Sequence, residues 1–203
     1  KEVVEEYRKY RSSRKAKLNI PMISRTQLPW YKDTDLIRLF DPSWENLNLV
    51  VYFIKHKNAP LTRLLGESAT IQSLNSQAAI NISDRNVIDY LIFFCYFILG
   101  KHFAFHLIES PDDPFLDGSL KEHEDNKIRE MINPIEYKGK NKEGEFRCNG
   151  TLAHGDAMFK AEFTIAESGE VRMLSDERFD FKLSRPLSYP LELKSKLWFW
   201  RKN

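Results

Sequence analysis

Residues 86–110, NVIDYLIFFCYFILGKHFAFHLIES, form the most apolar stretch of the chain and decide which folds are open to it. The uninterrupted apolar run at its centre, residues 90–99, has ten residues, whereas a helix needs roughly 20 to cross a bilayer. A transmembrane helix is therefore excluded for this stretch. A helix that is apolar on every side packs inside a protein, so we expect this one to be buried between other elements.

The flanking residues predict that this helix covers residues 84–99. Ser83 is a suitable N-cap residue, and Asp89 lies near the positive end of the helix dipole. Gly100 suits the position after the last turn, where the chain leaves the helix in a left-handed conformation. Beyond it the apolar period changes from helical to alternating, which predicts a strand over residues 103–109. The side chains expected in the core are Leu91, Phe94, Cys95 and Ile98.

Shorter signals mark the elements on either side of this helix. Residues 47–55, LNLVVYFIK, are rich in β-branched and aromatic residues and predict a strand. Prolines at positions 21, 29 and 42 predict an irregular connection before it. Weaker patterns predict a short exposed helix within residues 1–17, extended segments at 68–74 and 78–82, and an amphipathic helix at 119–132.

Residues 145–183 have the alternating pattern of consecutive antiparallel strands. Residues 145–153 and 157–166 alternate, and tight turns are predicted at 154–156 and 167–170. Further strands are predicted at 171–175 and 179–183. The set expected to point inward is Phe159, Ala161, Phe163 and Ile165, and the set expected to point outward is Met158, Lys160, Glu162 and Thr164.

Together these patterns predict the α+β fold class. We expect an antiparallel sheet of five to seven strands, packed on or curled around the central hydrophobic helix, with a C-terminal β-meander. The predicted domain organisation has an exposed basic N-terminal segment at residues 1–25, a single α+β domain at 26–193, and a basic aromatic tail at 194–203.

The charge distribution separates the two ends from the body of the chain. Residues 1–17 and residues 194–203 each have a net charge of +4, so the total of +2 leaves −6 on residues 18–193. Such basic ends bind the acidic body, a partner or a polyanion, or are simply solvated. The two cysteines, Cys95 and Cys148, have no CxxC spacing, which predicts buried, reduced thiols in a cytoplasmic protein.

One region has residue types that bind metals. His102 and His106 are four residues apart in a predicted strand, which places both imidazoles on one face. Asp112 and Asp113 follow as oxygen donors, so a metal-dependent hydrolase or nuclease is one hypothesis. A polar, partly exposed strand face is the competing interpretation, and it is favoured because no third ligand stands at a fixed spacing.

A nuclease interpretation rests on a short acidic pattern. Asp112 with residues 136–138, Glu-Tyr-Lys, resembles the PD…ExK pattern of a large nuclease superfamily. A second match, Asp180 with residues 192–194, shows how easily the letters arise by chance. His154 beside Asp156 fits a tight turn better than a catalytic pair, since no nucleophile has a comparable setting. Gly-rich phosphate loops are absent from the sequence, so we expect no cofactor.

The C-terminal tail combines aromatic and cationic residues. Trp198, Trp200 and Arg201 are of the types that anchor protein interfaces, and they are the predicted partner-binding residues. A nucleic acid is the less favoured partner, because the acidic body of the chain repels it. The sequence also allows association into a homo-oligomer. The function we predict is a non-catalytic interaction domain that binds a protein through its sheet edge or its tails. The alternative is the metal-dependent hydrolase or nuclease described above.

Overall fold

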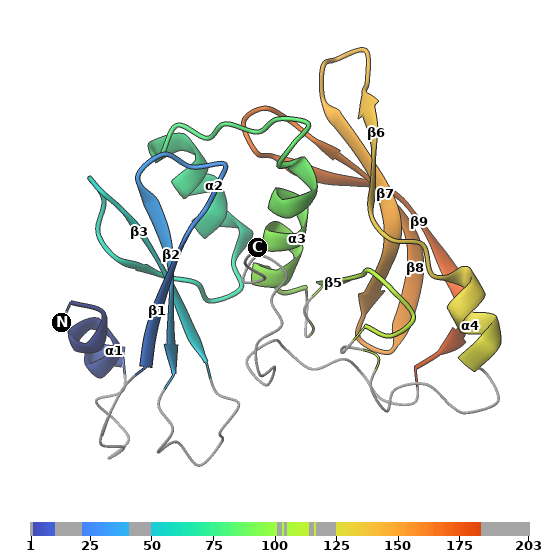
Figure 1. Cartoon of the computed structure of the whole chain (residues 1–203), viewed down its shortest axis with the longest axis horizontal. Helices are drawn as coiled ribbons and strands as arrows, with labels where there is room; N and C mark the ends of the chain where they lie inside the picture. Colours follow the sequence, from blue (N-terminus) through green and yellow to red (C-terminus); the bar gives the residue numbers. More distant parts are fainter. Residues whose placement is uncertain are drawn as a thin grey trace.

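The computed structural model describes residues 2–10, 22–40, 50–100, 103, 105–113, 116 and 125–183, with the backbone alone for residues 8–10 and 125–127. These residues form two antiparallel sheets, of four and five strands, together with four helices (Figure 1). The chain therefore belongs to the α+β class. The sequence predicts one sheet of five to seven strands, whereas the strands divide between two sheets.

The first sheet has the strand order β1-β2-β3-β4. Its strands are β1 (Met22–Gln27), β2 (Thr34–Phe40), β3 (Val51–His56) and β4 (Thr62–Arg63). The sequence predicts an irregular connection before residue 47. This prediction is wrong where the chain forms β1 and β2. Pro29 lies in the turn between these two strands, and the other two prolines lie outside their ends. Prolines thus flank the strands instead of interrupting them.

Helix α1 (Glu2–Tyr10) covers one face of the first sheet. Val3 and Tyr7 are buried against side chains of β2 and β3, where the sequence predicts a helix that buries little. Their spacing of four residues places both on one side of the helix, so a polar helix still presents an apolar contact. The sheet residues that they meet are Ile37, Leu39, Val51 and Phe53.

Helix α2 (Ser68–Gln77) occupies the region where extended segments are predicted. Ile71 and Leu74 are buried on one stripe of this helix, with Asn75 beside them. The prediction of an extended segment at 68–74 is wrong, because these residues are helical although Ser, Thr, Asn and Gln fill most positions outside the apolar stripe. These residues weaken the helical signal, but they do not prevent a helix whose apolar stripe is packed.

Helix α3 (Val87–Phe97) is shorter than the predicted 84–99. Its N-cap residue is Asn86 and not Ser83, and the Asn86 side-chain oxygen accepts a hydrogen bond of 2.8 Å from the Ser83 N–H. At the other end Ile98 is extended and forms an isolated bridge with Gly66. Gly100 is not in the left-handed region. A Cβ at Gly100 would lie 2.5 Å from Cε1 of His154, so close packing explains the glycine.

The side chains of α3 enter one apolar cluster with residues of both sheets. Trp30 from the β1–β2 turn packs against Tyr90 and Phe93, with ring centroids 5.6 and 5.2 Å away. Figure 1 shows α3 between the two sheets. Leu91, Phe94 and Cys95 are buried, and Ile98 is partly buried. Residues of the second sheet in the same cluster include Phe146, Cys148, Leu152, Ala161, Phe163 and Ile165.

The second sheet has the order β5-β7-β8-β9, and β6 also pairs with β7. Its strands are β5 (Phe105–Ile108), β6 (Glu136–Lys140), β7 (Phe146–His154), β8 (Ala157–Ile165) and β9 (Val171–Lys182). The last three are consecutive in the chain and pair antiparallel. Strand β9 runs without a break for 12 residues across the two shorter segments that the sequence predicts.

Helix α4 (Asp125–Met131) packs on the face of the second sheet that is turned away from α3. Met158 and Ile128 are buried together there. The sequence predicts an outward-pointing Met158, and this is wrong because a helix covers that face as well. Phe159, from the set predicted to point inward, is partly buried on the α3 side. In the described part of the chain, no helix has the length and apolar character needed to cross a membrane.

A chain of buried hydrogen bonds connects the two halves. The Tyr31 hydroxyl donates to the Asn75 side-chain oxygen, and the Asn75 amide donates to the Tyr90 hydroxyl at 2.9 Å. Tyr90 in turn donates to the Gly169 carbonyl at 2.6 Å. Burial raises the pKa of both tyrosines above its ordinary value, so both remain protonated donors. The chain joins the first sheet, α2, α3 and the β8–β9 turn.

The Gly169→Ala variant tests this connection. Gly169 has a φ of 81°, and a Cβ there would lie 2.3 Å from the Asn75 side-chain nitrogen. Gly144 also has a φ of 81°, but its Cβ would meet nothing within 4 Å. We expect Gly144→Ala to cost about 1–2 kcal/mol of backbone strain, and Gly169→Ala to cost a further 1–3 kcal/mol or so through overpacking. Urea unfolding of both variants measures the difference, and equal losses would contradict the contact.

Candidate functional site

Strand β1 is an edge strand with an uninterrupted ladder. It pairs with β2 in one continuous register from Met22 opposite Phe40 to Gln27 opposite Asp35. Within the described residues no strand pairs with its other side. Met22 and Ile23 are 60% and 42% exposed, although both are large and apolar. A regular edge of this kind offers unpaired N–H and C=O groups to another extended segment.

The charge that could protect this edge is neutralised. Arg25 is the one charged residue of β1, and its guanidinium pairs with the Asp35 carboxylate. Proteins usually block an exposed edge with lysine, proline or a bulge, and β1 has none of these between its first and last residue. Neither the backbone geometry of β1 nor its side chains therefore block pairing with another strand.

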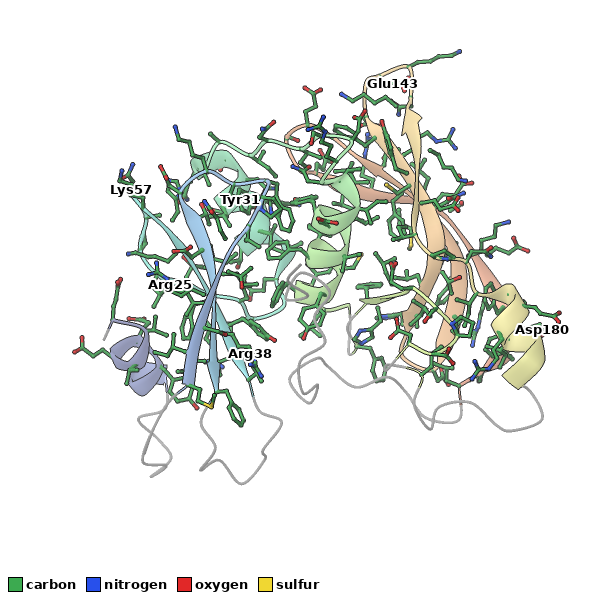
Figure 2. The ribbon with its side chains drawn as sticks, in the orientation of Figure 1. Arg25, Tyr31, Arg38, Lys57, Glu143 and Asp180 are labelled. Atoms are coloured by element: carbon green, nitrogen blue, oxygen red, sulfur yellow. The ribbon has the colours of Figure 1, made fainter. Side chains whose placement is uncertain are left out.

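Strand β9, at the edge of the second sheet, has the opposite character. Its ladder with β8 shifts register at two places, and Leu174 is the additional residue at one of them. Met173 and Leu174 are exposed, at 45% and 55%, but Arg172 precedes them and a run of charged residues begins two positions after Leu174. Bulges and charges are the features that prevent edge-to-edge pairing. The charged residues of β9 are Arg172, Asp176, Glu177, Arg178, Asp180 and Lys182, of which Figure 2 labels Asp180.

The other edges are short. Strand β4 has two residues, and β5 and β6 have four and five. Both β5 and β6 pair with β7, so they share one side of that strand. Short edge strands give little length for a partner to pair with. Among the described strands, β1 thus combines a regular ladder, an unpaired side and exposed apolar residues.

Arg38 lies on β2 beside this edge. It stands opposite Ser24 of β1 and Tyr52 of β3, on the face that is turned toward α3, whereas Arg25 is on the other face (Figure 2). Its guanidinium carbon is 5.9 Å from the centre of the Phe40 ring. The Arg38 Nε atom is buried and has no hydrogen-bond partner within the described part of the chain. Among the described residues Arg38 forms no ion pair.

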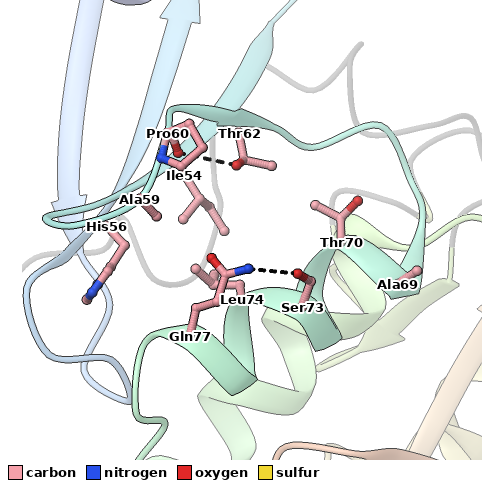
Figure 3. A pocket seen from close by; sticks show the side chains of 10 residues that line it. All are labelled: Ile54, His56, Ala59, Pro60, Thr62, Ala69, Thr70, Ser73, Leu74 and Gln77. Carbon is pink, nitrogen blue, oxygen red and sulfur yellow. Dashed lines mark hydrogen bonds between the residues drawn. The ribbon is translucent and has the colours of Figure 1, made fainter.

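A groove lies between the β3–β4 hairpin and α2, with a cavity volume of about 330 Å³. Ile54, Pro60 and Leu74 give it apolar walls, and hydroxyl and amide groups of α2 lie along its rim (Figure 3). The Gln77 amide donates to the Ser73 hydroxyl at 3.0 Å. His56 lines the groove, but none of the other lining residues is Asp, Glu, Lys or Arg, so these walls provide no charged acid–base pair.

The residues of the metal hypothesis have other contacts. Asp112 pairs with Arg129 at 2.7 Å, and the Asp113 carboxylate accepts a hydrogen bond of 3.2 Å from the Glu109 N–H. His106 is buried, and His102 lies outside the described residues. Where side chains are described, no group of three His, Cys, Asp or Glu residues could hold a metal ion.

Where the structure describes them, the residues of the acidic patterns and the turn histidine have other partners. Glu136 and Lys138 of the PD…ExK pattern form an ion pair with each other on β6. In the second match, residues 192–194 lie outside the described residues. The His154 ring stacks on Phe105 at a centroid distance of 4.3 Å, and Asp156 pairs with Lys182 at 3.1 Å. These two turn residues therefore face different partners.

Two buried thiols are also unsuited to catalysis. Burial raises the pKa of Cys95 and of Cys148 to about 12, so neither forms a nucleophilic thiolate near neutral pH. Both cysteines are free and buried, which agrees with the sequence-based expectation. The predicted partner-binding residues Trp198, Trp200 and Arg201 lie outside the described residues, and their role stays a prediction.

No protein-family model, no curated protein and no solved structure matches the chain. Its function is therefore inferred from the geometry of its own residues.

Sequence reasoning missed β1 and Arg38. The signal for β1 was the pair of prolines at positions 21 and 29, which bracket a strand-length segment. Nothing local in the sequence indicates that Arg38 faces Ser24.

The raised pKa of Asp89 makes the stability of the fold depend on pH. It lies in the first turn of α3, where the helix dipole favours the carboxylate, yet burial raises its pKa to about 6. The folded state therefore holds this proton more tightly than the unfolded chain does. Stability contributed by the protonated form is present below about pH 4 and is lost as the pH rises toward 6.

We expect Asp89→Asn to stabilise the protein near pH 7.5 and to have little effect near pH 4. Asparagine has no charge to desolvate, so it removes the cost that ionisation brings. Urea unfolding at both pH values measures the effect, and Glu143→Gln in the exposed β6–β7 turn is the control. A stabilisation that is the same at both pH values would show that burial of the charge is not its cause.

Proposed function

We propose that this chain is a non-catalytic protein-binding module whose partner adds an extended segment to the outer edge of β1. The observation that supports this most directly is the contrast between the edges. Strand β1 has a continuous ladder, exposed Met22 and Ile23 and a neutralised charge, whereas β9 is bulged and charged. Addition of a strand to an open edge is a common mode of peptide recognition, in which main-chain hydrogen bonds provide affinity.

The rest of the proposed module serves as a framework for this edge. In it the buried helix α3 and the C-terminal β-meander form the core of a single domain, over residues 26–193, to which the basic ends are attached. The division proposed from the sequence needs two adjustments, since β1 begins at Met22 and α1 packs on the first sheet. Preorganisation of an edge by a rigid sheet reduces the conformational entropy that binding costs.

The C-terminal tail is the proposed second contact. Trp198, Trp200 and Arg201 have the residue types of interface anchors. If the tail adds to a protein contact, Trp198→Ala and Trp200→Ala weaken binding more than neutralisation of the tail cations does. Binding measurements at two salt concentrations distinguish this from a polyanion contact, which would weaken steeply with salt.

Selection of displayed random peptides on the intact chain tests the proposed function. Hydrogen exchange of the free protein and of its complex with a selected synthetic peptide then locates the contact. We expect the amides of residues 22–27 to exchange more slowly in the complex, because outward N–H groups become hydrogen-bonded. Peptides that bind without slowing exchange in β1 would contradict the proposal.

A matched pair of variants tests which edge is used. We expect Met22→Ser with Ile23→Ser to weaken binding of the selected peptide about tenfold or more, which corresponds to about 1.4 kcal/mol. The control, Met173→Ser with Leu174→Ser, removes a similar exposed pair from β9 and should change affinity little. Titration calorimetry measures both, and a larger loss in the β9 variant would reverse the assignment.

Proline substitution tests the role of the backbone itself. Successive N–H groups of an edge strand point alternately toward β2 and outward, so either Ser24→Pro or Arg25→Pro removes an outward donor. The variant that keeps its thermal stability identifies the outward position, because the ladder with β2 is then intact. We expect that variant to lose peptide binding, and undiminished binding would exclude pairing at this position.

A further inference from the structure

The proposed strand addition leads to an inference about the chemistry of the partner, and this inference rests on that proposed function. A strand that pairs with β1 presents every second side chain on the face that carries Met22 and Ser24. On this face Ser24 stands opposite Arg38 of β2. The side chains next to the open edge therefore include one arginine, separated from the edge by a single small residue.

Among the described residues, Arg38 is a cation without an anionic partner. Its Nε atom is buried without a hydrogen-bond partner, and no described carboxylate pairs with its guanidinium. Asp35, the one carboxylate of β2, lies on the opposite face and pairs with Arg25. A buried polar group that lacks a partner is unfavourable, and for a charged group the cost is greater. The missing partner is an acceptor, and the strongest acceptor for a guanidinium is a carboxylate.

The geometry places such a carboxylate on the incoming strand. Neighbouring strands are about 4.8 Å apart, so an added strand lies roughly 10 Å from the backbone of β2. An arginine and a glutamate that extend toward each other span this distance across the short side chain of Ser24. Phe40 lies against the guanidinium from within its own strand, which restricts the directions that Arg38 can take.

We propose that the partner segment is an acidic strand whose carboxylate pairs with Arg38 across Ser24. The next position on the same face of that strand lies beside exposed Met22 or beside Thr26, according to its direction. An apolar side chain there would bury Met22. The recognised pattern is thus an acidic residue and an apolar residue that are separated by one position, within an extended segment.

The experiment compares two arginine variants with the same displayed random peptides. We expect peptides selected on the unchanged protein to carry Asp or Glu two residues from an apolar residue, and this preference to disappear with Arg38→Gln. Arg25→Gln is the matched control, because Arg25 belongs to the same edge but faces away and is already paired with Asp35. Arg38→Lys keeps the charge and should retain a weaker preference.

A double-mutant cycle on one selected synthetic peptide measures the pairing. Replacement of its acidic residue by the amide should weaken binding to the unchanged protein about tenfold, and should have little effect on binding to Arg38→Gln. Thermal unfolding of each variant shows that it is folded. An acidic preference that survives Arg38→Gln, or one that vanishes with Arg25→Gln, overturns the inference.

The outcomes separate this inference from the proposed function. If selected peptides slow amide exchange in β1 but carry no acidic preference, strand addition stands and the role of Arg38 is overturned. If no selected peptide slows exchange in β1 of any variant, both are overturned. If the peptides protect β1 and the preference depends on Arg38 alone, both are supported.

Discussion

The hydrogen-bond chain from Tyr31 through Asn75 and Tyr90 to the Gly169 carbonyl is the constraint on which the rest of the structure depends. Each member comes from a different element, so the bonds form only when those elements are in place together. In an apolar interior an unmade bond costs more than a made bond contributes. The two sheets therefore cannot shift past α3 independently without leaving buried polar groups unsatisfied.

This constraint determines what the sheets can offer to other molecules. Helix α3 occupies the inner side of each sheet, while α1 and α4 pack on the outer sides. With both faces of a sheet in contact with helices, its unpaired backbone groups are at the edges. The proposed function at an edge strand thus uses the backbone groups that this architecture leaves unpaired.

The sequence predicts the elements whose pattern is local. The apolar run of α3 and the alternation in β7 and β8 are properties of consecutive residues, and both are present close to their predicted places. The sequence did not predict helix α2, because its apolar stripe consists of only Ile71 and Leu74, and Ser, Asn and Gln occupy most of the other positions. The outward assignment of Met158 failed for a different reason, since only the tertiary structure brings α4 over that face.

The division into two sheets and the candidate edge could not be read from the sequence. Which strands pair is a long-range property, and the isolated bridge between Gly66 and Ile98 illustrates how far apart in sequence such contacts lie. The same holds for Arg38, whose position behind Ser24 depends on the register of β1 with β2. The prolines near the ends of β1 were the available signal for this strand, but prolines with the same spacing also occur in irregular loops.

The two long edges of the molecule differ in a way that stability alone does not explain. The charges and bulges of β9 are features that disfavour edge-to-edge pairing, and the same features would fit on β1, whose residues are also mostly exposed. Strand β1 instead keeps two apolar side chains in water and borders an arginine with a buried, unbonded nitrogen. Each of these features is unfavourable in the isolated chain, and the proposed acidic segment would bury the apolar side chains and pair with the arginine. The proposed occupant would thus account for both features, whereas separate structural explanations would otherwise be needed for each of them.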